Sequence, residues 1–111
     1  MNADKIRTCV LFDIYGELLS PSVADAVDLY YNDDLSLSEA AENTGISRQG
    51  IRDSIVRGVE LLESYESKLR LYDKYKSNEE TLARIRSEIR GCGIPQDAQD
   101  RILSLLDTLS I

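Results

Sequence analysis

Three polar side chains near the middle of the chain have the types and the spacing to contact nucleic acid. Arg48, Gln49 and Arg52 lie in a stretch without proline that is typical of a helix. A helix turns by about 100° per residue, which places them away from the apolar side formed by Ile51 and Ile55. Arginine and glutamine donate hydrogen bonds to base edges in a major groove. This spacing therefore predicts a surface that contacts bases.

Ser47 adds a second kind of contact at the start of this helix. Serine is a favoured N-cap, and the unpaired backbone amides of a first helical turn can hold a phosphate. Asp53 and Glu60 belong to the same outward side and would repel phosphates. We predict nucleic-acid contacts at Ser47, Arg48, Gln49 and Arg52. The alternative is that this surface docks a protein.

A helix-turn-helix spanning residues 37–55 would position these side chains. Ser36 followed by Glu39 matches a capping box, in which each side chain satisfies the other residue's backbone amide. Gly45 supplies the positive φ with which many helices end, and Ile46 is expected to be buried in the turn. Two short helices joined through a glycine are far more specific than either helix alone.

The rest of the chain also has helical periodicity. Hydrophobic residues make up 42% of its 111 residues, and alternating strand-like runs are absent, so we predict an all-α fold. One helix is expected over 4–19, and a second begins at Pro21. The second helix of the motif is expected to run from Ser47 to about Lys76, since no proline interrupts this stretch. Ser77 and Glu80 then match another capping box. We therefore predict two domains, 1–76 with an extended helix and 77–111 as a helical hairpin.

The long helix carries a heptad-like apolar seam. Its proposed members are Ile55, Leu62, Tyr65, Leu69 and Tyr72. With Gly58 included, they recur at alternating spacings of three and four, as in a coiled coil. Such a seam extends further than a small core can cover, so we predict that a second copy covers it in a homodimer. Coverage by the C-terminal segment is the alternative.

Composition argues against several classes of function. The chain has no histidine and only Cys9 and Cys92, so we predict no metal site, no cofactor and no catalytic centre. Charges throughout the first 19 residues argue against a signal peptide or membrane insertion, which favours a cytosolic protein. The formal net charge of −7 disfavours duplex DNA as the main partner, since DNA-binding surfaces are usually basic.

Residues 19–75 resemble the YlxM-like helix-turn-helix proteins of bacteria, which are themselves similar to region 4 of primary sigma factors. The resemblance is carried by three stretches: Leu-Tyr-Tyr at 29–31 with Asp-Asp-Leu-Ser-Leu at 33–37, Gly-Ile-Ser-Arg-Gln at 45–49, and the run at 61–69. It implies a sigma region 4-like, all-helical bundle with a tendency to dimerise. The nucleic-acid contacts at residues 47–49 and 52 also match the sigma-like pattern.

The same resemblance implies an accessory, regulatory role in protein targeting by the signal recognition particle (SRP). The expected partners are the GTPases of that pathway or the particle's RNA. Two alternatives stay open. One is a DNA-binding transcriptional regulator, and the other is a dimerisation scaffold without a nucleic-acid partner.

Overall fold

Every regular element described in the structure is helical. The computed structural model describes residues 3–109, in which there is no strand, so the predicted all-α class is confirmed. The α-helices are α1 (Ala3–Tyr15), α2 (Pro21–Val27), α3 (Leu37–Thr44), α4 (Arg48–Leu69), α5 (Leu71–Gly91) and α6 (Gln96–Asp107). A 3-10 helix, η1 (Gly16–Leu18), follows α1, and a π-helix, η2 (Asp28–Asn32), follows α2.

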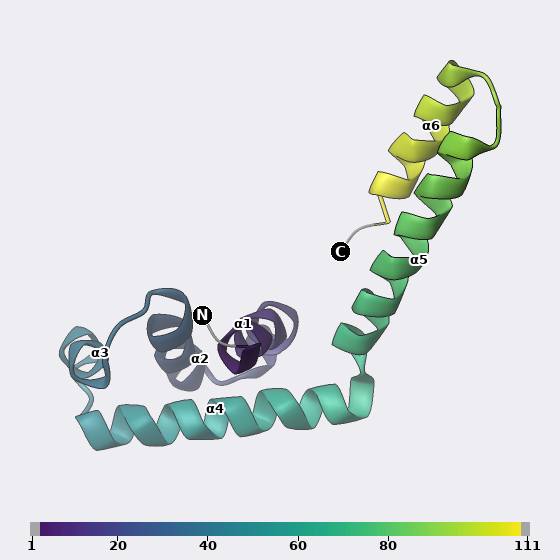
Figure 1. The fold of residues 1–111 in the computed structure, drawn as a ribbon. Helices are drawn as coiled ribbons and strands as arrows, with labels where there is room; N and C mark the ends of the chain where they lie inside the picture. Colours follow the sequence, from purple (N-terminus) through teal and green to yellow (C-terminus); the bar gives the residue numbers. More distant parts are fainter. Residues whose placement is uncertain (1–2, 110–111) are drawn as a thin grey trace. The chain divides into compact units, whose positions relative to one another are not determined.

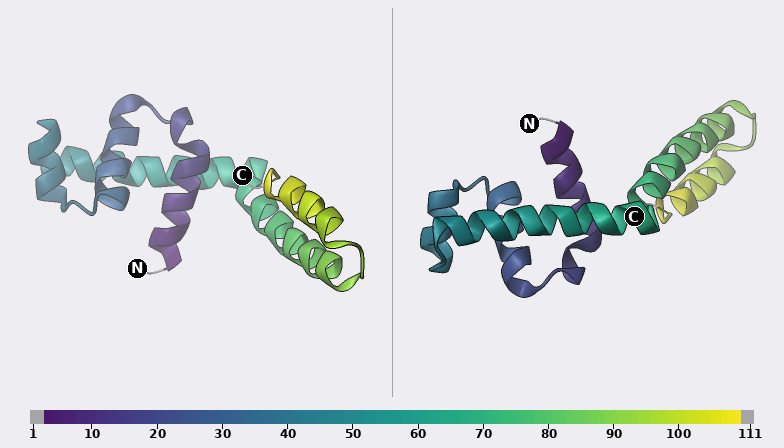
Figure 2. Two further views of the ribbon diagram at one scale, coloured as in Figure 1. Left: turned by 90° about the horizontal axis from the view of Figure 1, so that it is seen from above. Right: turned by 90° about the horizontal axis from the view of Figure 1, so that it is seen from below.

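The chain forms two compact units, of which the first ends at Tyr72 and the second begins at Asp73. In the first unit, α1, α2 and α3 lie against one side of α4 (Figure 1). The two views of Figure 2 show α1 crossing α4 steeply. The helix α4 is therefore the common support of this unit.

Two hydrophobic clusters join these helices to α4. One cluster consists of Leu11, Tyr15, Leu19, Val27 and Leu62. The other consists of Ala26, Ala40, Ile51 and Ile55. Each cluster takes residues from α4 and from at least one helix that precedes it, so burial of apolar surface holds the unit together.

A glycine of α4 allows α2 to pack closely against it. A Cβ atom at Gly58 would lie 2.5 Å from Cγ2 of Val27 and 3.0 Å from Cγ1 of Val23. A contact of 2.5 Å does not occur in real packing, so a larger residue at this position would require Val27 or α2 to shift. The sequence suggests only that glycine is tolerated at this position, whereas the structure shows that the close packing depends on it.

The predicted helix of residues 47–76 is wrong at its C-terminal end. Helix α4 ends at Leu69, and Arg70 takes a left-handed conformation with φ 55° and ψ 34°. Helix α5 begins at Leu71 and continues through Ser77, so the predicted capping box of Ser77 with Glu80 does not start a helix.

One side chain of α1 and one of α4 stabilise this break between α4 and α5. The carboxylate of Glu66, which is buried with 4% exposure, accepts a hydrogen bond from the amide of Tyr72 at 3.0 Å. The hydroxyl of Tyr15 accepts one from the amide of Leu71 at 3.2 Å. The first amides of a helix have no partner within it, so these contacts allow α5 to start without a local cap.

The predicted seam is largely covered by the chain itself. Leu62 is fully buried at 0% exposure, Ile55 is also buried, and Tyr65 and Tyr72 pack against the first cluster. Within one chain these residues already pack against α1, α2 and α3, so they need no second copy to be buried. Leu69 differs, with 55% of its surface exposed. Dimerisation itself stays a prediction.

The second unit is an antiparallel pair formed by α5 from Asp73 onward and α6 (Figure 1). Gly93, with φ 76°, lies in the turn, and Pro95 directly precedes α6. The guanidinium of Arg86 pairs with the carboxylate of Asp107 at 3.0 Å. Among the residues described in this unit, Leu82 is the only buried hydrophobic one.

Several large hydrophobic residues of this pair are exposed. Its large exposed hydrophobic residues are Ile85, Ile102, Leu105 and Leu109. Within residues 3–109, no helix is both long enough and apolar enough to cross a membrane.

Candidate nucleic-acid interface

Helix α3 begins with the predicted capping box. Its first amides are satisfied because Ser36 Oγ accepts from the Glu39 amide at 3.0 Å and Glu39 Oε1 accepts from the Ser36 amide at 2.9 Å. Hydrogen bonding of the Glu39 carboxylate to the backbone amide of Ser36, and then to the Ser36 side chain, favours the ionised form and lowers the pKa of Glu39 below its ordinary value. The start of α3 is therefore fixed by a local capping box that the sequence already predicts.

The turn between α3 and α4 follows the predicted pattern with one exception. Gly45 has φ 73°, as expected, and the Thr44 hydroxyl donates to the Ala40 carbonyl at 2.9 Å. Ile46, which the sequence places in the turn core, is instead 38% exposed. Its side chain lies over Gly50, where a Cβ atom would come within 2.9 Å of Ile46 Cγ2. Ala40 of α3, in contrast, is fully buried in the second hydrophobic cluster.

The start of α4 brings the four predicted contact residues together at one exposed helix end. Ser47 is the N-cap, and its Oγ accepts from the Gly50 amide at 3.0 Å. Arg48, Gln49 and Arg52 follow within the first two turns and are exposed. The positive end of the helix dipole and two guanidinium groups therefore share one small surface.

The three side chains are not equally free to bind a ligand. Among the described residues, neither Arg48 nor Arg52 forms an ion pair. The Gln49 amide group donates to Asp53 Oδ1 at 2.9 Å, so contact with a base would have to replace this bond. Asp53 and Glu60 are exposed, as the sequence predicts. Arg48 and Arg52 are therefore the side chains best placed to bind an anionic ligand.

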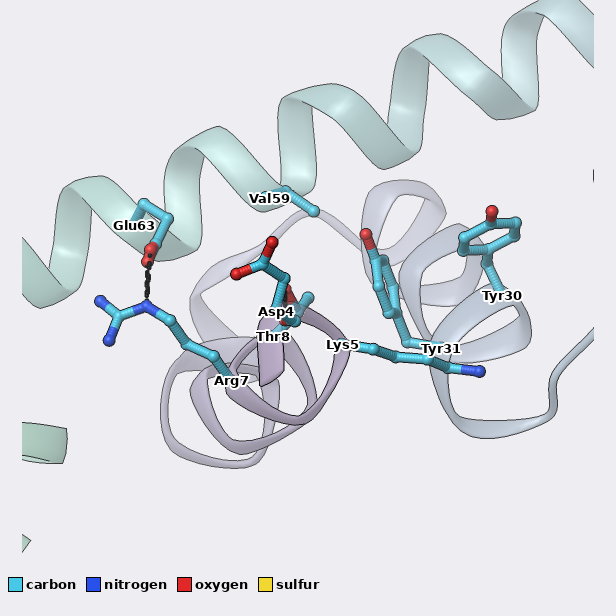
Figure 3. A pocket seen from close by; sticks show the side chains of 8 residues that line it. All are labelled: Asp4, Lys5, Arg7, Thr8, Tyr30, Tyr31, Val59 and Glu63. Carbon is cyan, nitrogen blue, oxygen red and sulfur yellow. Dashed lines mark hydrogen bonds and ion pairs between the residues drawn. The ribbon is translucent and has the colours of Figure 1, made fainter. Parts of the chain in front are cut away.

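The same unit has a second candidate site, a pocket that the sequence analysis did not predict. A pocket of about 440 Å³ opens between α1, η2 and α4 (Figure 3). Its lining consists of Asp4, Lys5, Arg7, Thr8, Tyr30, Tyr31, Val59 and Glu63. These residues come from three distant segments, and no motif or spacing joins them. Burial and the neighbouring Tyr30 raise the pKa of Tyr31, so its hydroxyl stays neutral at pH 7.

The described part of the chain contains no cluster of three histidine, cysteine or carboxylate side chains placed to hold a metal ion. Cys9 is half-buried and Cys92 is exposed, and both are free thiols.

Comparison with known proteins now adds to this geometry. The model of the UPF0122 family, described as "Putative helix-turn-helix protein, YlxM / p13 like", matches residues 2–100. The chain belongs to the UPF0122 family. The resemblance to YlxM-like proteins found in the sequence is therefore confirmed, and it extends over most of the chain.

The similarity to other UPF0122 proteins covers most of this chain and most of each relative. A UPF0122 protein of Bacillus pumilus is 39% identical over 99 residues, covering 89% of this chain and 90% of the relative. A UPF0122 protein of Clostridium kluyveri is 51% identical over 77 residues, or 69% of each chain. One from Limosilactobacillus reuteri is 42% identical over 88 residues, covering 79% of this chain and 77% of the relative. The helix-turn-helix seen here is thus the feature by which the whole family is described.

Proposed function

We propose that this UPF0122 protein is a non-enzymatic, cytoplasmic regulator of the SRP pathway that contacts RNA through its helix-turn-helix. This RNA contact is supported by two exposed arginines at the capped start of α4, Arg48 and Arg52, which form no ion pair with any carboxylate within residues 3–109. The pathway rests on the resemblance to YlxM-like proteins. The GTPases of the pathway are the second class of proposed partner.

The charge of the first unit limits the kind of nucleic acid. Up to Tyr72 the chain has 7 Lys and Arg against 13 Asp and Glu, a net charge of −6. A long duplex would bring many phosphates close to this acidic surface. A compact RNA element, in contrast, can contact Arg48 and Arg52 without approaching the acidic surface. The acidic remainder of the unit is suited to a basic protein surface.

Binding experiments with the purified particle RNA and the two GTPases test this proposal. Replacing Arg48 and Arg52 with alanine should abolish RNA binding without unfolding the protein, because both side chains are exposed. The matched control replaces Arg84 and Arg90, two exposed arginines of α5, and removes the same charge. If the wild-type protein binds none of the three partners at physiological salt, the proposal is wrong.

A DNA-binding transcriptional regulator is the second candidate. It is favoured by the outward position of Arg48, Gln49 and Arg52, which are residue types that read base edges. It is opposed by the net charge and by the bond between Gln49 and Asp53. Selection from random duplexes distinguishes the two, since a regulator should enrich one sequence and an RNA-binding protein should enrich none.

We further propose that the protein is a homodimer joined through the second unit. An isolated pair of helices with one buried hydrophobic residue has too little core to be stable by itself. The exposed residues Ile85, Ile102, Leu105 and Leu109 provide an apolar surface for the same surface of a second copy. Of the seam residues predicted from the sequence, only Leu69 is exposed enough to contribute.

A further inference from the structure

The charged groups that line the pocket between α1, η2 and α4 are paired, with one exception. Arg7 Nε donates to both carboxylate oxygens of Glu63, at 2.7 and 3.1 Å, and Lys5 pairs with Asp34. The side chain of Asp4 has no hydrogen bond or ion pair among the described residues. The pocket therefore presents one carboxylate whose charge is not balanced by an ion pair.

One side of this carboxylate is aromatic and apolar, and the other is formed by an ion pair. In Figure 3, the carboxylate of Asp4 points toward α4 and lies between the pair of Arg7 with Glu63 and the ring of Tyr31. Val59 of α4 forms the wall above it. The Tyr30 ring meets the Tyr31 ring edge-on, with centroids 5.1 Å apart. The π-helix η2 places both rings at this site.

This combination matches the two parts of a long basic side chain. Lysine and arginine carry an aliphatic stem, which packs against apolar surface, and a charged head, which seeks a carboxylate. Val59 and Tyr31 offer the apolar surface, the tyrosine ring attracts cations, and Asp4 offers the counter-charge. The net charge of −6 on the surrounding unit attracts cationic segments over a longer range.

We propose that this pocket binds one arginine or lysine side chain from a basic segment of a partner protein. The site lies on α1, η2 and α4 and shares no residue with the surface formed by Arg48 and Arg52. Failure of the RNA contact would therefore leave this proposal intact, and the converse also holds.

Fluorescence anisotropy with a short labelled peptide of glycine, serine and arginine tests the pocket at physiological salt. A peptide with citrulline in place of arginine keeps the shape and removes the charge. Asp4→Asn should weaken binding of the arginine peptide by about fivefold to tenfold, the effect of losing one charge-assisted contact. Asp25→Asn, an exposed acidic residue of α2, removes the same charge elsewhere and should weaken it by less than about twofold.

Amide shifts on adding the arginine peptide should be centred on Thr8, Tyr31 and Val59. Three results would overturn the proposal. The first is equal weakening by both variants, which would mean that net charge alone attracts the peptide. The second is equal binding of the citrulline peptide. The third is the absence of binding, or shifts confined to another surface.

Discussion

The hydroxyl of Tyr15 donates a 2.7 Å hydrogen bond to Oε1 of Glu66, and the same oxygen accepts from the Tyr72 amide at 3.0 Å. Both side chains are buried, with Tyr15 in the first hydrophobic cluster. Because the Tyr15 hydroxyl also accepts from the Leu71 amide, one buried network joins α1 to the end of α4 and the start of α5.

Tyr15→Phe should lower the free energy of unfolding by about 1–3 kcal/mol, since it removes the buried hydroxyl that donates to the Glu66 carboxylate and accepts from the Leu71 amide. Urea unfolding followed by circular dichroism measures the change. Tyr75→Phe removes a hydroxyl that has no hydrogen bond among the described residues, and it should leave stability nearly unchanged. Equal losses in the two variants would show that the network contributes nothing specific.

Gly58→Ala should destabilise the first unit by about 1–3 kcal/mol, because its Cβ atom would overlap Val27. Combining it with Val27→Ala makes room for the methyl group, so the pair should lose less than the sum of the two single losses. Gly91→Ala is the control, since no atom lies within 4 Å of the added Cβ. Thermal unfolding of the four variants would reveal strict additivity, which would contradict the proposed overlap.

The Glu39 carboxyl should titrate below the ordinary glutamate range in an NMR pH titration. Its pKa is lowered by hydrogen bonds from the backbone and side chain of Ser36, which favour the ionised form. The capping contribution is therefore complete above the ordinary carboxyl pKa and is lost as the pH falls through the lowered value. Ser36→Ala keeps the backbone amide and removes the hydroxyl, so it should move the midpoint part of the way upward. An unchanged midpoint would show that the Ser36 side chain does not contribute to the lowered pKa.

Arg52→Ala should reduce the salt dependence of RNA binding. Each phosphate contact makes the slope of log K against log salt about 0.7–0.9 more negative, so loss of one contact should make the slope less negative by about that amount. Arg90→Ala, on the other unit, should leave the slope unchanged. A loss of affinity at constant slope would indicate that Arg52 contacts a base and not a phosphate.

Leu105→Glu should convert a homodimer to monomer in sedimentation equilibrium, because Leu105 is 67% exposed on the proposed interface. Leu18→Glu alters an exposed leucine of the first unit and should leave the association unchanged. A dimer that persists in Leu105→Glu would place the interface elsewhere. Leu62→Glu is uninformative here, since Leu62 is fully buried within its own chain and the variant would unfold.

Much of the helix-turn-helix could be predicted because its signals are local. The capping box of Ser36 with Glu39, the positive φ of Gly45 and the cap at Ser47 each involve residues within a few positions of one another. The four candidate contact residues were found for the same reason. The pocket around Asp4 could not be found this way, because α1, η2 and α4 meet only in the folded chain.

The sequence by itself thus determined the all-α class, the caps of α3 and α4, and the family. Only the tertiary structure decided where α4 ends and what covers Leu62. No residue near Arg70 is a helix breaker, and the partners that satisfy the first amides of α5 include Tyr15, far away in the sequence. A helical periodicity records which residues are apolar, but it carries no information on which distant side chain accepts a backbone hydrogen bond or which helix buries the apolar side.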